Sequence, residues 1–120
     1  MADVLAVDDS PSMRALVRAT LEEAGLSVVQ AEDGVAALEV AQRESVRVCL
    51  VDVNMPRMDG ITLVSELRKL TAYKFTPILM LTTEVDTEKK AKAKGAGATG
   101  WLVKPFDPPK LIATLRRVLQ

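Results

Sequence analysis

The chain has no histidine and only one cysteine, Cys49, among its 120 residues. Without histidine it can form neither a Cys/His metal site nor a Ser-His-Asp catalytic triad. A single cysteine excludes an internal disulfide bond, which is consistent with a reducing compartment. These absences leave carboxylates, hydroxyls and lysines as the groups available for chemistry.

An excess of one charge is also lacking, since 16 basic residues balance 16 acidic ones. A net charge of zero gives no general attraction to nucleic acid or to an anionic membrane, so we expect neither as a partner. No apolar run approaches the ~20 residues that span a bilayer. The N-terminal stretch MADVLAVDDS also lacks the basic region of a signal peptide. The sequence therefore predicts a soluble cytoplasmic protein.

Short apolar runs alternate with amphipathic patterns along the whole chain, and these predict strands and helices respectively. The expected strands cover residues 4–7, 26–31, 46–53, 77–83 and 99–103, and the expected helices cover residues 10–25, 33–44, 60–70, 87–97 and 107–119. In the first helix, Ser10 is the expected N-cap, and Gly25 the expected stop. Five such pairs with short connections predict one α/β domain over residues 1–120, with a parallel sheet covered on both faces.

The stretch GAGATG at residues 95–100 matches the G-x-G-x-x-G fingerprint of dinucleotide-binding folds. That fingerprint must follow a strand and begin a helix, because the helix N-terminus receives the pyrophosphate. Here the expected order is reversed, with a helix before the glycines and a strand after them. We therefore interpret the glycines as a helix C-cap and a tight turn into the last strand.

Polar and charged residues stand at the carboxyl ends of four of the five expected strands. Asp8 and Asp9 follow the first strand, Asp52 lies at the end of the third, Thr82 at the end of the fourth, and Lys104 follows the fifth. In an open parallel sheet these ends meet at one edge, which is where such folds bind ligands. We expect the five side chains to share one cleft.

Grouped carboxylates repel one another and are costly to desolvate unless a cation relieves them. Mg²⁺ prefers such oxygen ligands, and phosphate groups often supply further ones. A lysine ammonium suits phosphoryl oxygens, and a threonine hydroxyl can donate a hydrogen bond. The set is therefore suited to phosphoryl transfer. Asp52 would be the nucleophile that forms an aspartyl-phosphate, and Asp8 and Asp9 would hold the metal.

Each of these residues also has an ordinary structural interpretation. Asp8 and Asp9 could favour the start of the next helix through its dipole. Asp52 could serve the turn-rich stretch DVNMPRMDG. Thr82 could cap the next segment, and Lys104 could be a solvated lysine. The combination of compatible groups at four strand ends favours phosphoryl transfer over these separate roles.

With these residues in view, the chain resembles the receiver domains of two-component response regulators. The DD pair, LVDVNMPRMDG, LTT and KPF carry the resemblance, which extends from VLAVDDS to the last helix. It implies a (βα)5 flavodoxin-like three-layer sandwich with strand order 2-1-3-4-5. It also implies a signalling protein rather than an enzyme, with self-catalysed phosphotransfer and autodephosphorylation at most.

The resemblance further implies a role for each matching position. Asp52 would accept a phosphoryl group from a histidine kinase of the CheA type. The Mg²⁺ ligands would be Asp8, Asp9, Asp52 and the backbone carbonyl of Asn54, and the phosphoryl oxygens would contact Thr82 and Lys104. The Lys104–Pro105 bond is typically cis in this family.

Two positions depart from the usual family pattern. Trp101 stands where a Tyr or Phe usually turns inward on activation, so Thr82 and Trp101 would form the switch; a half-buried strand aromatic is the alternative. Thr83 stands where a small Ala or Gly is common. Asn54, Thr83 and Glu84 would border the mouth of the site and tune hydrolysis of the aspartyl-phosphate.

Because no effector domain follows the last helix, we expect the output to be a surface made by residues 87–97, 99–103 and 107–119. The first of these segments has only Ala91 and Ala93 as apolar anchors, beside Val85. Its lysines give it a basic outer face. We expect phosphorylation to shift this lightly held helix, and a partner to detect the shift.

The stretches PILMLTTE and GATGWLVKPFDPPKLIATL are most similar to stand-alone chemotaxis receivers of the CheY type. The expected partner is then a flagellar motor switch protein. The alternative is a phosphate sink or phosphorelay intermediate that exchanges phosphate with a histidine phosphotransfer protein. An aspartyl-phosphate hydrolase would need an Asp where Asn54 stands, and a non-phosphorylated binding module would not need the acidic pocket. Charged helix faces favour a monomer.

Overall fold

The computed structural model describes residues 2–82 and 87–119 of the chain. Five parallel strands form one sheet in the order β2-β1-β3-β4-β5. The strands are β1 (Ala2–Val7), β2 (Val28–Ala31), β3 (Val46–Asp52), β4 (Ile78–Thr82) and β5 (Gly100–Val103). The helices are α1 (Pro11–Glu23), α2 (Gly34–Arg43), α3 (Gly60–Lys69), α4 (Thr87–Ala96) and α5 (Pro108–Leu119), with a short 3₁₀ turn η1 (Thr71–Tyr73). This flavodoxin-like order confirms the one that the resemblance implied.

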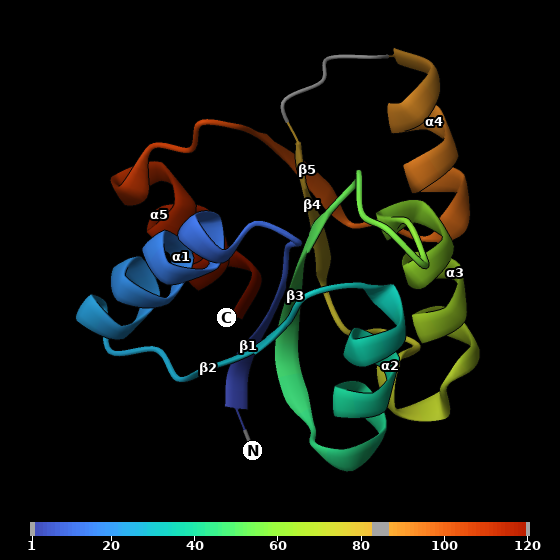
Figure 1. Ribbon diagram of the computed structural model, residues 1–120, viewed down its shortest axis with the longest axis horizontal. Helices are drawn as coiled ribbons and strands as arrows, with labels where there is room; N and C mark the ends of the chain where they lie inside the picture. Colours follow the sequence, from blue (N-terminus) through green and yellow to red (C-terminus); the bar gives the residue numbers. More distant parts are fainter. Residues whose placement is uncertain (1, 83–86, 120) are drawn as a thin grey trace.

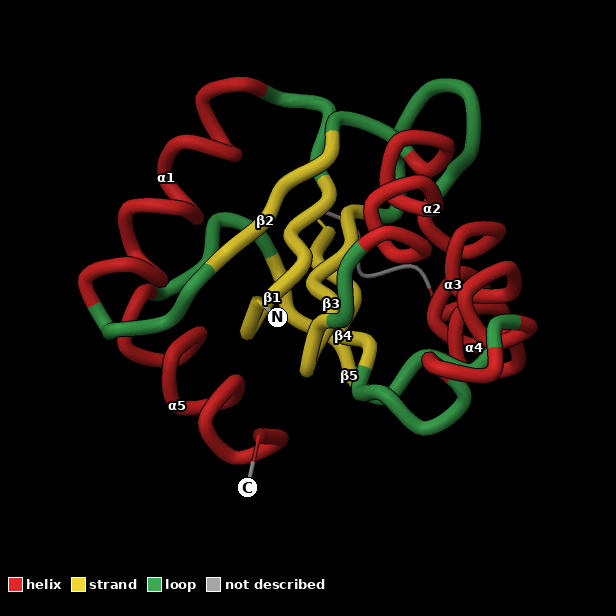
Figure 2. Tube along the Cα trace, turned by 90° about the horizontal axis from the view of Figure 1, so that it is seen from below, coloured by secondary structure: helices red, strands yellow, loops and turns green. Residues whose placement is uncertain are grey.

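The sheet lies between two layers of helices. Helices α1 and α5 cover one face, and α2, α3 and α4 cover the other, as the two perpendicular views show (Figures 1 and 2). Alternate residues of each strand point into the two cores. On β3, Cys49 and Val51 belong to the α2–α4 core, whereas Val48 and Leu50 belong to the α1–α5 core. Burial on both faces explains why β3 is an almost continuous apolar run.

The first helix begins and ends at the predicted residues. The Ser10 side chain accepts a hydrogen bond from the Met13 N–H at 3.2 Å, and Pro11 occupies the first helical position. Gly25 has a φ of +82°, which favours glycine, and its N–H donates to the Glu22 carbonyl at 3.0 Å. These local signals set both ends of α1.

Gly97 of GAGATG forms the predicted helix C-cap, while Gly95 lies within α4 and Gly100 begins β5. Gly97 has a φ of +115°, its N–H donates to the Lys94 carbonyl at 3.0 Å, and the Ala98 N–H donates to the Ala93 carbonyl at 2.9 Å. This pair of bonds is the Schellman arrangement that ends a helix. The segment therefore turns α4 into β5, and it offers no helix N-terminus to a dinucleotide.

The turn η1 was not predicted from the sequence. Its Tyr73 is buried, and its hydroxyl lies 2.8 Å from the Ala41 carbonyl oxygen and 2.6 Å from that of Glu44. These are unpaired carbonyls at the end of α2, which a donor must satisfy. A partner some thirty residues away in sequence therefore holds this turn, which has no strong signal of its own. No helix in the described ranges is long and apolar enough to cross a membrane.

Gly60 is expected to be the glycine least tolerant of a side chain. A Cβ there would overlap the Asp52 carbonyl oxygen and lie 3.0 Å from the Val53 Cα. Backbone cannot swing aside as a flexible side chain can. Gly60→Ala should therefore lower the free energy of unfolding by about 2 kcal/mol or more.

Gly95→Ala is the matched control for this prediction, measured in the same urea titrations. A Cβ at Gly95 would meet no atom within 4 Å. Alanine is the better helix former, so this variant should gain about 0.5–1 kcal/mol. Equal stability of the two variants would contradict the close approach of α3 to the end of β3.

Candidate functional site

The strand register brings the predicted residues to one edge of the sheet. The aligned pairs are Val7 with Val51, Asp52 with Leu81, and Thr82 with Val103. Asp8 therefore leaves β1 beside Asp52 of β3, and Lys104 leaves β5 beside Thr82 of β4. Residues far apart in sequence meet because all the strands run in one direction.

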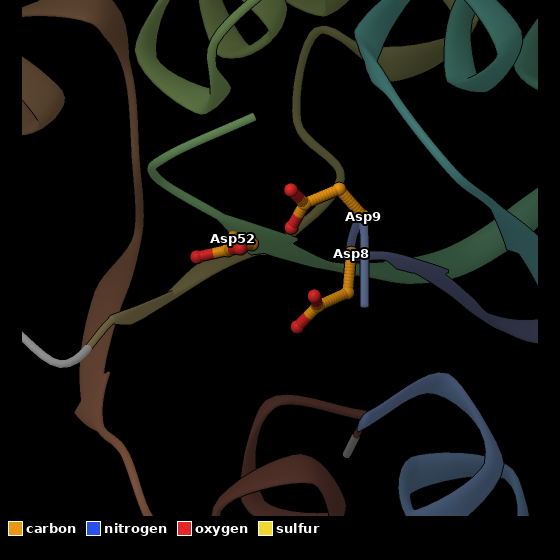
Figure 3. A group of neighbouring side chains, drawn as sticks. All are labelled: Asp8, Asp9 and Asp52. Atoms are coloured by element: carbon orange, nitrogen blue, oxygen red, sulfur yellow. The ribbon is translucent and has the colours of Figure 1, made fainter. Parts of the chain in front are cut away.

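Three carboxylates form a cluster at this edge. Asp8 and Asp9 follow β1, Asp52 ends β3, and one carboxylate oxygen from each lies within 4.8 Å of the others (Figure 3). Asp8 and Asp52 are only 5% and 6% exposed, whereas Asp9 is exposed to solvent. Two buried acidic groups beside a third make an oxygen-rich site that is open on one side.

Lys104 is the cation of this cluster. Its Nζ lies 2.8 Å from Asp8 Oδ2 and 3.4 Å from Asp52 Oδ2, and its side chain is 11% exposed. The Lys104–Pro105 bond is cis, as the resemblance implied. Among the residues that the structure describes, no other side chain forms an ion pair with these carboxylates. The interpretation of Lys104 as an ordinary solvated lysine is therefore wrong.

The pKa of Asp52 is raised above its usual range. Burial is the main cause, and the negative charge of Asp8 adds to it. The Lys104 ammonium and a hydrogen bond from the Asn54 backbone N–H act in the opposite direction without cancelling the rise. Ionised Asp52 is thus a partly desolvated carboxylate, which suits a nucleophile and favours a cation beside it.

Asp8 serves the local structure as well as the cluster. Its Oδ1 accepts a hydrogen bond from the Ser10 N–H at 2.9 Å, and its backbone carbonyl accepts one from Arg14 at 2.7 Å. Its Oδ2 contacts Lys104. One carboxylate oxygen of Asp8 thus holds the backbone before α1, while the other faces the cluster.

The remaining predicted positions surround these groups. Thr82 is buried on β4, and its carbonyl accepts a hydrogen bond from the Lys104 N–H at 2.7 Å. Asn54 is exposed, and its side-chain oxygen accepts a 3.4 Å hydrogen bond from Lys89 of α4. The proposed tuning residues Thr83 and Glu84 lie outside the described residues.

Trp101 is half-buried on β5 and packs against the core on the α2–α4 side. Its Nε1 is buried and has no hydrogen-bond partner among the described residues. The Lys90 Nζ lies 5.6 Å from the ring centroid, which is a cation–π distance. A cavity of about 290 Å³ between α4 and β5 has both side chains in its lining. The indole thus sits where a shift of α4 would change its surroundings.

Helix α4 is anchored even more lightly than the sequence indicated. Ala93 is buried, but Ala91 is exposed, and Val85 lies outside the described residues. Ala93 is the one buried residue within α4 (Thr87–Ala96). Little apolar area therefore holds this helix to the sheet.

The ion pair between Arg57 and Asp33 was not predicted from the sequence. Arg57 lies in the loop after Asp52, and its Nε is 2.8 Å from Asp33 Oδ2. All of α2 and β3 lie between the two residues, which are 24 positions apart, so no local pattern links them. The helix predicted over residues 33–44 begins where expected, since the Asp33 side chain caps α2 (Gly34–Arg43).

Comparison with known proteins identifies the family. The profile of the response regulator receiver domain matches residues 4–116. The chain is a response regulator receiver domain. The chemotaxis protein CheY homolog of Campylobacter jejuni is 40% identical over 118 residues, which cover 97% of this chain and 91% of that protein.

Solved receiver structures agree with this assignment. The chemotaxis protein CheY4 of Vibrio cholerae is 56% identical with a TM-score of 0.94, and the match covers 98% of each chain. The receiver domain of a Pseudomonas aeruginosa sensor histidine kinase is 28% identical with a TM-score of 0.91, over 98% of this chain and 97% of that one. That structure is described as having a magnesium ion coordinated in its active site cleft.

Proposed function

We propose that this receiver takes a phosphoryl group from a histidine kinase onto Asp52 and uses the modified form as a signal. The observation that carries the proposal is the position of Asp52. Its buried carboxylate, with a raised pKa, lies 3.4 Å from the Lys104 ammonium and beside the acidic pair Asp8 and Asp9. Such an arrangement suits phosphoryl transfer, in which positioning and charge neutralisation supply most of the rate.

The acidic cluster fits Mg²⁺. Its three carboxylate oxygens within 4.8 Å are hard ligands, and only one ammonium balances them among the described residues. Asp8, Asp9, Asp52 and the Asn54 carbonyl would hold the ion. The Pseudomonas receiver with magnesium in its active site cleft supports a metal in this family's cleft. Bound Mg²⁺ would neutralise charge on the transferring phosphoryl group.

The residues of the chain would then act as follows. A carboxylate oxygen of Asp52 attacks the phosphorus of a phosphohistidine, the P–N bond breaks as the O–P bond forms, and the imidazole nitrogen keeps the electron pair. Lys104, already 3.4 Å from Asp52, can form an ion pair with the negatively charged phosphoryl oxygens. The Thr82 hydroxyl can donate to another of these oxygens.

The output surface would be formed by α4, β5 and α5. Phosphorylation would act through Thr82 and Trp101 on the lightly anchored α4, whose Lys90 already contacts the indole ring. Because the Campylobacter and Vibrio relatives are named chemotaxis proteins, the proposed kinase is of the CheA type and the proposed target is a flagellar motor switch protein. A histidine phosphotransfer protein is the alternative partner. We further propose that the receiver acts as a monomer in the cytoplasm.

Intact-protein mass spectrometry after incubation with acetyl phosphate tests this function. We expect one phosphoryl group per chain with Mg²⁺ and none with EDTA, and fragmentation should place it on Asp52. Rapid acid quenching at short times guards against fast hydrolysis. A phosphoryl group on another residue, or uptake that is independent of Mg²⁺, would contradict the proposal.

A further inference from the structure

The loop between β3 and α3 carries Asn54, whose backbone faces the phosphorylation site. The Asn54 N–H donates a hydrogen bond to the Asp52 carboxylate, and its carbonyl is the proposed fourth metal ligand. At its far end the loop is tied to α3, because the Gly60 N–H donates to the Val53 carbonyl at 2.9 Å and the Asp59 side chain caps the helix. Contacts that hold the middle of this loop therefore also help to place the Asn54 backbone.

The middle of the loop contains an unfavourable backbone conformation at Arg57. Its φ is +65°, and it is the only non-glycine residue with a positive φ among residues 2–82 and 87–119. The Met58 N–H donates to the Pro56 carbonyl at 2.7 Å, which closes a three-residue γ-turn around Arg57. Such a turn persists only where surrounding contacts offset its conformational cost.

Those contacts come from the start of α2. Arg57 forms two parallel hydrogen bonds with one carboxylate, Nε to Asp33 Oδ2 at 2.8 Å and Nη2 to Asp33 Oδ1 at 3.0 Å. The Asp33 side chain is only 6% exposed. Beside this pair, Met58 lies directly on Gly34, where an added Cβ would come within 2.6 Å of the Met58 Cβ. The loop is thus joined to α2 by a bidentate ion pair and a close apolar contact.

The Asp33 carboxylate is kept in its ionised form. The hydrogen bond from Arg57 is the main cause that keeps the pKa of Asp33 below its ordinary range, and the Ala36 N–H contributes as well. The Ala36 bond, at 2.8 Å, is the N-cap of α2 and does not depend on Arg57. The capping role therefore explains the position of the Asp33 carboxylate. It does not explain why Arg57 adopts a positive φ and pairs with that carboxylate.

We propose that the Arg57–Asp33 pair is a latch that positions the β3–α3 loop for cation binding. It holds the γ-turn against α2, and thereby keeps the Asn54 backbone beside Asp52, where its carbonyl can complete the cation site. Arg57 is a positioning residue, since it touches neither the cluster nor a substrate. This inference rests on the proposed Mg²⁺ site. It adds that a residue pair outside the site controls how tightly the site binds Mg²⁺.

Two variants remove the latch while preserving the local fold. Asp33→Asn keeps an oxygen that can cap α2 but removes the charge that pairs with Arg57. Arg57→Gly removes the guanidinium, and glycine adopts a positive φ without a steric penalty. Arg47→Gln is the matched control, because it breaks a comparable 3.2 Å ion pair with Asp3 that links the β3 strand to β1.

The measurement is the dissociation constant for Mg²⁺ alone, from amide chemical shifts of the unphosphorylated proteins, together with their urea midpoints. We expect each latch variant to weaken Mg²⁺ binding by about tenfold, as is typical when a group that orients a metal ligand is lost. The double variant should bind no more weakly than the weaker single variant, because both remove the same contact. Arg47→Gln should bind Mg²⁺ like the unmodified protein.

The outcomes distinguish this inference from the proposed function. If the unmodified protein binds no Mg²⁺, the proposed function fails and the latch fails with it. If it binds Mg²⁺ and the latch variants bind equally well, only the latch is refuted. Additive losses in the double variant, or an equal loss in Arg47→Gln, would also refute the latch, since the effect would then not come from one specific contact.

Discussion

Asp52→Asn is expected to abolish phosphoryl uptake and at the same time to stabilise the metal-free protein. The loss of uptake follows because an amide has no carboxylate oxygen to form the acyl phosphate. The gain in stability follows because burial and the charge of Asp8 make ionised Asp52 unfavourable in the fold. We expect a gain on the order of 1 kcal/mol at neutral pH, since part of the carboxylate's cost is already relieved by Lys104.

The stability gained by Asp52→Asn should depend on pH, and the raised pKa of Asp52 gives the direction of that dependence. A group whose pKa is higher in the folded than in the unfolded state binds its proton more tightly in the fold. Its destabilising effect is therefore absent below its unfolded pKa, about 3.9, and fully present above its folded pKa. The advantage of Asp52→Asn should be small near the unfolded value and should grow as the pH rises through the folded value.

Urea titrations across this pH range, with and without Mg²⁺, measure both effects. Mg²⁺ at ten times its dissociation constant should stabilise the unmodified protein by about 1.4 kcal/mol, and it should stabilise Asp52→Asn by less. Asp59→Asn is the control, because Asp59 is an exposed N-cap of α3 and asparagine caps equally well. An Asp52→Asn protein that still takes up one phosphoryl group, or that is less stable at neutral pH, would contradict this account.

Lys104→Met is the second substitution with a large expected effect. It should slow phosphoryl uptake from acetyl phosphate by about a hundredfold, which is typical for removal of one preorganised charge from a reacting centre. The Lys104 Nζ lies within 3.4 Å of both Asp8 and Asp52, and no other described side chain forms an ion pair with these carboxylates. Methionine retains most of the buried volume and removes only the charge.

Cation binding should respond to Lys104→Met in the opposite direction. Without the ammonium, Asp8 and Asp52 lose the ion pairs that compete with a metal, so Mg²⁺ should bind at least as tightly as before. Quench-flow mass spectrometry gives the rate, and amide shifts give the affinity. Lys110→Met is the control, because Lys110 is exposed on α5. Unchanged kinetics would show that Lys104 does not act on the phosphoryl group, and weaker Mg²⁺ binding would show that it supports the cluster structurally.

Much of the fold was predictable because its signals are local. Helix periodicity, the Ser10 N-cap and the glycine at 97 depend on neighbours a few residues away, and each is found as predicted. The meeting of Asp8, Asp52 and Lys104 was predictable for a topological reason. In a parallel sheet every strand ends at the same edge, so residues at strand ends converge without any knowledge of side-chain contacts.

The energetics of the site depend on contacts that form only in the folded protein. Burial of Asp52 and its raised pKa depend on packing from several elements, and Lys104 is an ion-pair partner rather than a solvated lysine because Asp8 lies 2.8 Å away. The Arg57–Asp33 pair and the Tyr73 contacts with α2 likewise join segments between 24 and 32 residues apart. Contacts between such distant residues produce no periodic pattern in the sequence. The order of elements and the chemistry at the strand ends could be predicted from the sequence. The distances between the site residues and the burial of their charged groups depend on the folded protein.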